Sequence, residues 1–531
     1  MKRMMYFAAA AVMGLGMAAS ANAKTLTYCS EASPSSFDPA LYEDGNTLDA
    51  VAPIYEGLVK FKVGTTEVLP ALAEKWEISK DGLTYTFHLR HGVKWQTTDN
   101  FTPTRDFNAD DVVFSFHRQL DANTPWNPYI PNTSYQYFGD MDMPNQLADV
   151  KKGADDYTVI LTLKQPSAPM LANLAMTFAN IVSKEYADKL QAAGQAAQLA
   201  DNPVGTGPFT FVGYNKDSDI HYKANPDYWG AKPKVDTLVF SITTDAATRL
   251  QKLKAGECDV MVSPAPADVA AIKADPNLKT QEQQGLNIAS LDYNTQEKPF
   301  DNPDVRHALN MAIDKKAIVA AVFQGLAQPA INPIPPTMWS YDKDIKDDPY
   351  DPAAAKALLD KAGVKDLHMK IWAMPVARPY MPDAKTAATL IQADFAKIGV
   401  TADIFSEDWK PYQKDSSPVT HDGAVIIGWT GDNGDPDNFL TPLLGCNAVG
   451  VSNRAEWCNK EFDDLIRKAA TVTDQAERTK LYEQAQVIFK KDAPWATLDH
   501  SVVVMAMSKK VSNYVMDPFG LHHFDEVDVA D

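Results

Sequence analysis

The sequence predicts a mixed α/β fold divided into two or three lobes. Segments with the period of strands and segments with the period of helices mix along the whole chain, as in α/β architectures. A chain of 531 residues is too long for one hydrophobic core, which indicates several lobes. Residues 24–31 and 497–507 both have strand patterns, which favours one lobe built from both chain ends with another lobe inserted into it.

The first 23 residues have the pattern of a secretory signal peptide. Lys2 and Arg3 precede an apolar run, and residues 21–23 form an A-x-A cleavage pattern. Cys29, the first cysteine, is not preceded by a lipobox. No later segment has about 18 uninterrupted apolar residues. We therefore expect a mature chain that begins at Lys24, lies in the bacterial periplasm and has no membrane span.

Charge and cysteine usage narrow the class of protein. The net charge of −19 argues against nucleic acid, because a nucleic-acid binder would present a basic stripe. Four cysteines in an oxidising compartment are expected to form disulfides. Among three possible pairings we favour Cys446 with Cys458, whose loop is short, and Cys29 with Cys258. A metal site is the weaker alternative, since no C-x-x-C spacing is present.

The first half of the chain contains clear element signals. Residues 67–95 read as two strands joined by a Lys-Asp-Gly turn, which is a hairpin pattern. Asn108 is a plausible N-cap for a helix that has an apolar stripe over the following 12 residues. The "NPVGTGPF" segment (202–209) is glycine-rich but lacks the lysine of a phosphate loop, so a tight turn is the favoured interpretation.

The second half adds further helices and one long connection. One helix is predicted to begin with Pro303 in its first turn, and a second helix is predicted to run from Asp314 to Gly325. Asp474 and a glutamate three residues later form a capping box before another helix. Residues 328–352 are proline-rich and too long for an ordinary connection, which indicates an ordered functional loop or a boundary.

The sequence contains no motif that indicates catalysis. It has no G-x-S-x-G, H-E-x-x-H, G-x-x-x-x-G-K-[ST] or C-x-x-C pattern. His522 and His523 could chelate a metal, but adjacent residues of a strand face opposite ways, which argues against it. We therefore expect no enzyme activity, no metal and no cofactor.

An acidic loop, "GWTGDNGDPDNFL" (428–440), directly follows the apolar stretch 424–427. Neither Asp432 nor Asp435, taken as position 1, gives the glycine at position 6 and glutamate at position 12 of an EF-hand. Two alternatives stay open: a carboxylate that binds a cationic ligand group, and a solvated turn. Trp429 favours the first, because an indole beside a buried strand suits a partly apolar cleft.

A second loop, "IWAMPVARPYMP" (371–382), has Arg378 as its only charge. A guanidinium held in so rigid a stretch can bind a carboxylate through two parallel hydrogen bonds. The alternatives are an arginine that caps backbone carbonyls, and a direct ion pair between Arg378 and Asp432.

Several segments resemble the family 5 solute-binding proteins of ABC importers. They are residues 75–119 together with "NPVGTGPF", "NPDVRHALNMAID", "PIPPTMW", "WAMPVARPYMP", "WTGDNGDPDNF" and "DPFGLHHFDEV". The two long loop motifs are typical of the branch that binds dipeptides, haem or glutathione. The resemblance covers nearly the whole mature chain. It implies an α/β, two-lobed periplasmic binding protein of type II with three subdomains and a ligand cleft between the lobes.

The resemblance also implies which residues meet the ligand. Asp432 is expected to hold the α-ammonium group of a peptide, and Arg378 its α-carboxylate. The backbone around these two side chains is expected to line the site, at Trp429, Thr430, Gly431, Pro379 and Tyr380. The first lobe acts as a lid, with Tyr135 and Tyr137 as candidate walls. Glu43 and Asp44 stand where the family usually has small hydroxylic residues, which would favour a basic group on the ligand.

The implied function is a periplasmic substrate-binding protein that captures dipeptides or other short peptides and delivers them to the permease subunits of an ABC importer. We expect a monomer. The alternative is a haem- or glutathione-binding protein of the same family, and a secreted peptidase is less favoured. The expected domains are 1–23 as signal peptide, 24–57 with 200–283 and 503–531 as first lobe, 58–199 as its extra subdomain, and 284–502 as second lobe.

An extended dipeptide spans about 7 Å. With a hydrogen bond of about 2.8 Å at each end, the carboxyl carbon of Asp432 and the guanidinium carbon of Arg378 are expected to lie about 12–14 Å apart.

Overall fold

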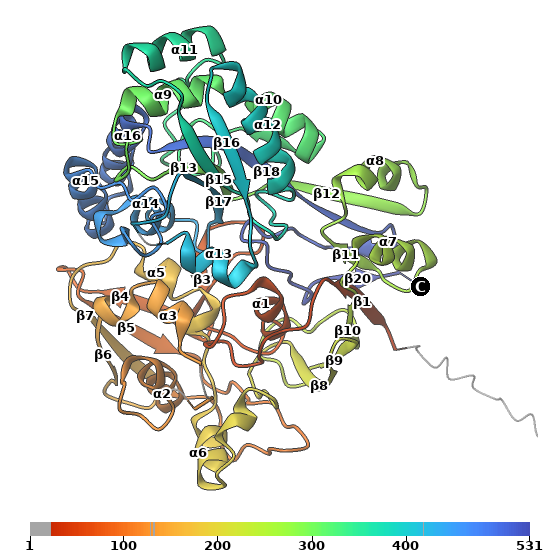
Figure 1. The fold of residues 1–531 in the computed structure, drawn as a ribbon. Coiled ribbons are helices and arrows are strands. Elements are labelled where there is room, and N and C mark those ends of the chain that lie inside the picture. Colours follow the sequence, from red (N-terminus) through yellow and green to blue (C-terminus); the bar gives the residue numbers. More distant parts are fainter. Residues whose placement is uncertain (1–22, 128, 131–132, 418, 531) are drawn as a thin grey trace, which may run out of the picture.

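The computed structural model describes residues 23–127, 129–130, 133–417 and 419–530. It has two lobes, with the blue and green second lobe above the orange first lobe in Figure 1. The predicted signal peptide lies outside the described residues except for its last residue. Within the described part of the chain, the helices are all too short or too polar to span a bilayer.

One long sheet runs through both lobes. Strands β12 (Leu278–Gln284) and β14 (Ala327–Pro329) also pair with its central strand, β18. The other strands, in the order in which they lie side by side, are β16 (Thr401–Phe405), β15 (His368–Trp372), β17 (Ala424–Thr430), β13 (Asn287–Tyr293), β18 (Trp495–Ser508), β11 (Val260–Val262), β1 (Thr25–Ser30), β10 (Thr237–Ile242), β9 (Asp219–Ala224) and β8 (Phe209–Asn215).

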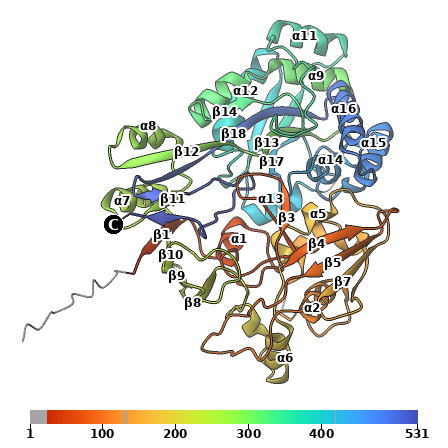
Figure 2. The same cartoon turned by 180° about the vertical axis from the view of Figure 1, so that it is seen from behind.

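Strand β18 links the two lobes. Its first part, from Trp495 to Asp499, pairs antiparallel with β13 of the second lobe. Its last part pairs with β12 and β11 in the first lobe, ending with Ser508 opposite Leu278. Figures 1 and 2 show this strand crossing between the lobes in both views. The prediction that both chain ends form strands is confirmed by β1 and β18.

The first lobe holds the sheet half that contains β1. Helix α1 (Gly45–Val51) and helices α7 (Ala246–Ala255) and α8 (Pro266–Ala274) belong to this lobe, and the short strands β19 (Val511–Ser512) and β20 (Asp528–Val529) pair near the C-terminus. In the segment 202–209, a Cβ added to Gly205 would lie 1.9 Å from the Ile54 carbonyl oxygen. Only glycine fits so close to another backbone, which supports the tight turn.

The extra subdomain has its own sheet and its own core. The antiparallel order is β4 (Ala73–Ile78), β5 (Thr84–Leu89), β7 (Thr158–Leu163) and β6 (Leu147–Lys152), and the hairpin of β2 (Val59–Phe61) and β3 (Val68–Pro70) lies beside it. Its helices are α2 (Ala109–Leu120), α3 (Gln136–Asp140), α4 (Met143–Gln146), α5 (Met170–Asn173) and α6 (Lys184–Ala192). The predicted hairpin is confirmed by the pairing of β4 with β5.

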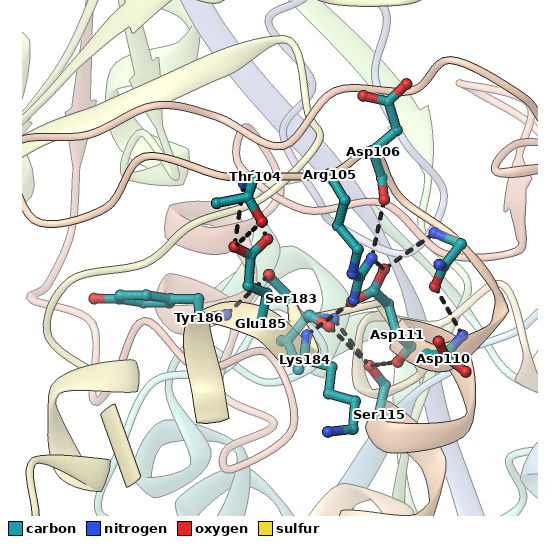
Figure 3. A network of polar contacts seen from close by, with 12 residues as sticks. Thr104, Arg105, Asp106, Asp110, Asp111, Ser115, Ser183, Lys184, Glu185 and Tyr186 are labelled. Carbon is teal, nitrogen blue, oxygen red and sulfur yellow. Dashed lines mark hydrogen bonds and ion pairs between the residues drawn. The ribbon is translucent and has the colours of Figure 1, made fainter. Parts of the chain in front are cut away.

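A polar network ties α2 to α6 (Figure 3). Asn108 caps α2, as predicted, and forms a capping box with Asp111. The Asp111 carboxylate accepts two hydrogen bonds of 2.7 Å from Arg105. It also accepts one of 2.8 Å from the backbone nitrogen of Lys184, at the start of α6. One buried carboxylate therefore accepts hydrogen bonds at the starts of both helices and joins α2 to α6.

The second lobe surrounds the other half of the long sheet with helices. The helices are α9 (Pro303–Ala312), α10 (Lys315–Ile318), α11 (Pro352–Lys361), α12 (Ala384–Lys397), α13 (Trp409–Asp415), α14 (Asp437–Leu444), α15 (Lys460–Thr471) and α16 (Gln475–Asp492). Pro303 lies in the first turn of α9, as predicted, and the Asp474 side chain caps α16 by accepting from the backbone nitrogen of Glu477. Asp314, where the sequence predicted that a helix begins, caps α10. A π-helical turn over Val319–Phe323 continues α10.

Two disulfides confirm the predicted pairing. Cys29 in β1 pairs with Cys258, across Cα atoms 5.8 Å apart. Cys446 pairs with Cys458, across Cα atoms 4.6 Å apart. The residue ranges predicted for the lobes stay a prediction.

Candidate functional site

The two loops that the sequence singles out leave neighbouring parallel strands. Strands β15 and β17 pair in parallel, with Ile371 opposite Ala424 and Trp372 opposite Val425. The Arg378 loop follows β15, and the Asp432 loop follows β17. Carboxyl ends of parallel strands meet at one edge of a sheet, which is where α/β proteins commonly bind ligands. The topology therefore brings Arg378 and Asp432 to one edge.

Asp432 lies half-buried just beyond β17 and is held by two polar partners. The side-chain amide of Asn438, in α14, donates to the Asp432 carboxylate at 3.0 Å and accepts from the Asp432 backbone nitrogen at 2.9 Å. The hydroxyl of Tyr137, in the first lobe, donates to the same carboxylate at 3.3 Å. Burial raises the pKa of Asp432 to about 6, and the two hydrogen bonds oppose that rise.

Arg378 lies partly exposed in the loop after β15. Its guanidinium stacks over the Trp409 ring, with 4.8 Å between the guanidinium carbon and the ring centroid. One of its nitrogens is 3.4 Å from the carbonyl oxygen of Ala377. The backbone of Arg378 exchanges hydrogen bonds with Met381 at 3.2 and 2.9 Å, which fixes the loop. The aromatic ring and the loop thus orient the guanidinium, which has no carboxylate partner among the described residues.

Asp432 and Arg378 form no ion pair with each other in the described structure. The sequence left open a direct pair between them, and the structure does not form it. A solvated turn is also not what the structure shows, because Asn433 and Asp435 in the same loop are 2% and 7% exposed.

Glycines let the two loops pack closely. A Cβ added to Gly428 would lie 2.5 Å from the Tyr380 ring, and one added to Gly431 would lie 2.5 Å from the Phe439 ring. Burial raises the pKa of Tyr380 to about 12. Trp429 donates to Asn438 at 3.1 Å, so the indole is fixed by the same amide that holds Asp432. Thr430 ends β17 opposite Asn287.

The other aspartates of the acidic loop have structural partners. Asp435 accepts two hydrogen bonds from Arg478, of 2.8 and 2.7 Å, and Arg478 also faces the Trp339 ring. Asp437 begins α14 and accepts from the Thr441 hydroxyl at 2.6 Å. Pro379 is exposed, and its carbonyl oxygen accepts from the Ser501 hydroxyl at 2.7 Å.

The two predicted tyrosine walls differ. Tyr137 bridges the lobes through Asp432 and packs its ring edge against Phe178. Tyr135 lies in the core of the first lobe instead. Its hydroxyl donates to the carbonyl oxygen of Trp126, and its ring lies 5.6 Å from the Arg118 guanidinium carbon. The structure therefore gives Tyr137, and not Tyr135, a contact with the second lobe.

Glu43 and Asp44 also have different surroundings. Asp44 caps α1, since its carboxylate accepts from the backbone nitrogen of Thr47 at 3.0 Å and from its hydroxyl at 2.9 Å. Glu43 keeps contact with solvent and accepts from the Gln136 amide at 3.0 Å. Loss of surrounding water and the nearby Asp140 and Asp432 raise the pKa of Glu43 to about 8.

Sequence reasoning missed Asn438 and Asp140 as neighbours of Asp432. Asn438 lies six residues along in the same loop motif, so its amide could have been proposed as a support. Asp140 comes from α3, and no local pattern could have placed it beside Glu43. Among the described residues, no cluster of three or more His, Cys, Asp or Glu could hold a metal ion. The arrangement can hold a cation at Asp432 and an anion at Arg378.

Comparisons with known proteins show which family this chain resembles. The model of the bacterial extracellular solute-binding proteins, family 5 Middle, matches residues 67–450. The dipeptide-binding protein of Escherichia coli K12 is 51% identical over 521 residues, which cover 98% of this chain and 97% of that protein. Heme-binding protein A of Haemophilus influenzae is 49% identical over 514 residues, which cover 96% and 93%.

A solved structure is similar over the same extent. It is the dipeptide-binding protein from Pseudoalteromonas sp. SM9913 in complex with Met-Leu, which is 37% identical. The match has a TM-score of 0.85 and covers 96% of this chain and 100% of that one.

Proposed function

This chain belongs to the bacterial extracellular solute-binding proteins of family 5, and from that premise we propose that it captures dipeptides and other short peptides by their charged ends. The proposal includes delivery of the peptide, in the periplasm, to the permease subunits of an ABC importer. Relatives at 51% and 50% identity that are named for binding dipeptides or di- and tripeptides support it.

One observation carries the proposal: two opposite charges at one sheet edge are not paired with each other. Arg378 stacks on a ring, and Asp432 is held by an amide and a hydroxyl. A free peptide is a zwitterion and supplies the two missing partners. Since Asp432 and Arg378 bind opposite ends, they select peptide length before side chains. For an extended dipeptide with one hydrogen bond at each end, the carboxyl carbon of Asp432 and the guanidinium carbon of Arg378 would lie about 12–14 Å apart.

The surroundings of Asp432 suit an ammonium group. With a pKa of about 6, most Asp432 carboxylates are ionised at neutral pH. Asn438 fixes the carboxylate plane, so little ordering is needed when the ligand arrives. An ion pair in this half-buried position is stronger than one in open water, because the local dielectric constant is lower.

The surroundings of Arg378 suit a carboxylate. A guanidinium has five donors in a planar fork, and stacking on Trp409 leaves the edge of that fork available. In our proposal this edge binds both oxygens of the peptide's C-terminal carboxylate. Tyr137 of the first lobe reaches the ammonium end when the lobes are closed, consistent with hinge closure in periplasmic binding proteins.

The haem-binding relative at 49% identity favours a second candidate within the family. Haem and glutathione each have two carboxylates, however, and the acidic groups Glu43, Asp140 and Asp432 gather at the ammonium end of the site. A second carboxylate there would meet the ionised Asp432 carboxylate, so a peptide with one carboxylate fits better. A secreted peptidase has less support still, because the family's members are binding proteins and no catalytic motif is present.

Isothermal titration calorimetry with a dipeptide panel, a tripeptide, glutathione and haem tests the proposal. We expect saturable heat with dipeptides, weak heat with glutathione and no Soret shift on titration with haem. No measurable heat with any dipeptide would contradict the proposal. Incubation of a dipeptide with the protein, followed by chromatography, is expected to return the dipeptide uncleaved.

A further inference from the structure

Three consecutive residues of the acidic loop contact three different parts of the first lobe. Asp432 accepts from Tyr137 in α3. The Asn433 amide donates to the side-chain oxygen of Asn173, at the end of α5, at 2.7 Å. A Cβ added to Gly434 would lie 2.4 Å from the Thr66 side chain, in the turn between β2 and β3. The loop is therefore one place where the extra subdomain meets the second lobe.

The pair of Asn433 and Asn173 is the most buried of these contacts. Each residue is 2% exposed, and 260 residues separate them in the sequence. Helix α14, which follows the loop, and α5 lie on opposite sides of the boundary between the lobes in both Figure 1 and Figure 2. The backbone nitrogen of Ala168 also donates to the carbonyl oxygen of Ala470 at 2.8 Å, across the same boundary.

Asn433 is fixed firmly on the side of the second lobe. Its side-chain oxygen accepts from the backbone nitrogen of Asp435 at 2.9 Å, which leaves its NH2 group for Asn173. Asp435 is in turn held by the two hydrogen bonds from Arg478. The donor that points across the boundary is thus positioned by a buried ion pair and not by the ligand.

From this geometry we propose that Asn433 and Asn173 form a latch that holds the lobes closed and so sets peptide affinity without contacting the peptide. In the open state both amides form hydrogen bonds with water. Closure replaces these by one hydrogen bond between the two side chains, with a modest net gain in free energy. A small gain allows the latch to open again. The Asn433 latch lies beside Asp432, so the loop that receives the ammonium group also fixes the closed state.

Replacing one asparagine of the latch is expected to destabilise only the closed state. In Asn173→Ala, closure buries the Asn433 donor without an acceptor, whereas in the open state water satisfies that donor. The variant leaves the Asp432 loop and all its hydrogen bonds within the second lobe intact. We expect the dipeptide Kd to rise about 10-fold, mainly through faster dissociation.

The experiment compares Asn173→Ala with a matched control, Asn100→Ala. The Asn100 amide donates to the Asn202 side chain at 3.1 Å, so it also forms a pair of asparagines, but an exposed one that lies wholly within the first lobe. Small-angle X-ray scattering of the ligand-free proteins measures lobe separation. We expect a larger radius of gyration for Asn173→Ala than for wild type and for Asn100→Ala. An unchanged radius of gyration for Asn173→Ala would overturn the latch.

A double-mutant cycle separates a latch from general loss of packing. Asn173→Ala is expected to raise the dipeptide Kd about 10-fold in the wild-type background and to have no further effect in an Asn433→Ala background. Equal effects in both backgrounds would overturn the latch. The measurement of dipeptide affinity rests on the proposed function, whereas the scattering measurement needs no ligand. If no peptide binds, the proposed function is wrong, and the radius of gyration still tests whether the latch exists.

Discussion

Asp432 and Asp435 lie three residues apart in one loop, yet their partners differ completely. Asp435 is 7% exposed and forms two hydrogen bonds with Arg478. Asp432 has an amide and a hydroxyl as partners and no cation within the described structure. A structural charge and a binding charge can therefore be distinguished by their partners. A charge that is paired with a buried opposite charge stabilises the fold, whereas an unpaired charge at a sheet edge is available to a ligand.

The arginines also differ in whether a carboxylate pairs with them. Arg118 in α2 pairs with Asp38 inside the first lobe, with both side chains fully buried. Arg478 pairs with Asp435 in the same way. Arg378 instead has an aromatic ring beneath it and no carboxylate partner within the described part of the chain. Mutation of a charge in the two ion pairs is therefore expected to lower stability, whereas mutation of Asp432 or Arg378 is expected to lower ligand affinity.

Asp435→Ala is expected to lower the free energy of unfolding by about 3–5 kcal/mol, because it leaves the buried Arg478 without a counter-charge. Thermal or urea unfolding measures this. Asp432→Ala in the same assay is expected to change stability by less than about 1 kcal/mol. If the two variants were equally stable, the distinction between the two aspartates would be wrong.

Asp432→Ala is expected to weaken dipeptide binding by about 3 kcal/mol, which raises the Kd by more than 100-fold. The reason is that the ammonium group loses its counter-charge in a half-buried position. Calorimetry measures the effect, with the exposed Asp201→Asn as a control of equal charge change. Normal binding by Asp432→Ala would show that the ammonium group binds elsewhere.

Arg378→Lys keeps the positive charge but loses the planar fork and the stacking on Trp409. We expect the dipeptide Kd to rise about 10-fold. A dipeptide whose C-terminus is an amide is expected to bind wild type and Arg378→Lys equally weakly. A variant that still binds the free acid with full affinity would refute the assignment of Arg378 to the carboxylate.

Dipeptide affinity is expected to fall as the pH drops through about 6, because only the ionised Asp432 pairs with an ammonium group. The pKa of Asp432 is higher in the folded state than in the unfolded state. Protonated Asp432 therefore stabilises the ligand-free fold at a pH below its ordinary pKa, and this stabilisation is lost as the pH rises through about 6. The Tm increase caused by a dipeptide is therefore expected to be larger at pH 7 than at pH 5. A pH-independent Tm increase would contradict this.

Glu43→Gln should have the smallest effect, and only on peptides with a basic first residue. Because the pKa of Glu43 is about 8, a nearby cationic side chain is expected to expel its proton when it binds at pH 7. Calorimetry of Lys-Ala in two buffers of different ionisation enthalpy measures that proton release. We expect release from wild type, none from Glu43→Gln, and the same small value for Ala-Ala with both proteins.

Local signals in the sequence predicted a large part of the fold. Asn108 and Pro303 mark helix starts through capping chemistry that acts over a few residues, and both predictions are confirmed. The loop motifs, with the family resemblance, led to Asp432 and Arg378. Their placement at one edge follows from the parallel pairing of β15 with β17, which pattern alone does not reveal.

Contacts between distant segments account for what could not be predicted. Tyr135 and Tyr137 are two residues apart with the same chemistry, and only the packing of α3 shows which one faces the second lobe. Asp44 and Glu43 are adjacent, and the start of α1 takes one as its cap. Asn173 has no signal at all in the sequence, because its partner is 260 residues away.

The central claim is that Asp432 and Arg378 hold opposite ends of one peptide. Calorimetry with Ala-Ala and N-acetyl-Ala-Ala, on wild type and Asp432→Asn, tests it most directly. We predict that acetylation raises the Kd of wild type by more than 100-fold and that of Asp432→Asn only a few-fold, because the acetyl group removes the charge that Asp432 binds. An equal loss of affinity with both proteins, or no loss with wild type, would contradict the claim.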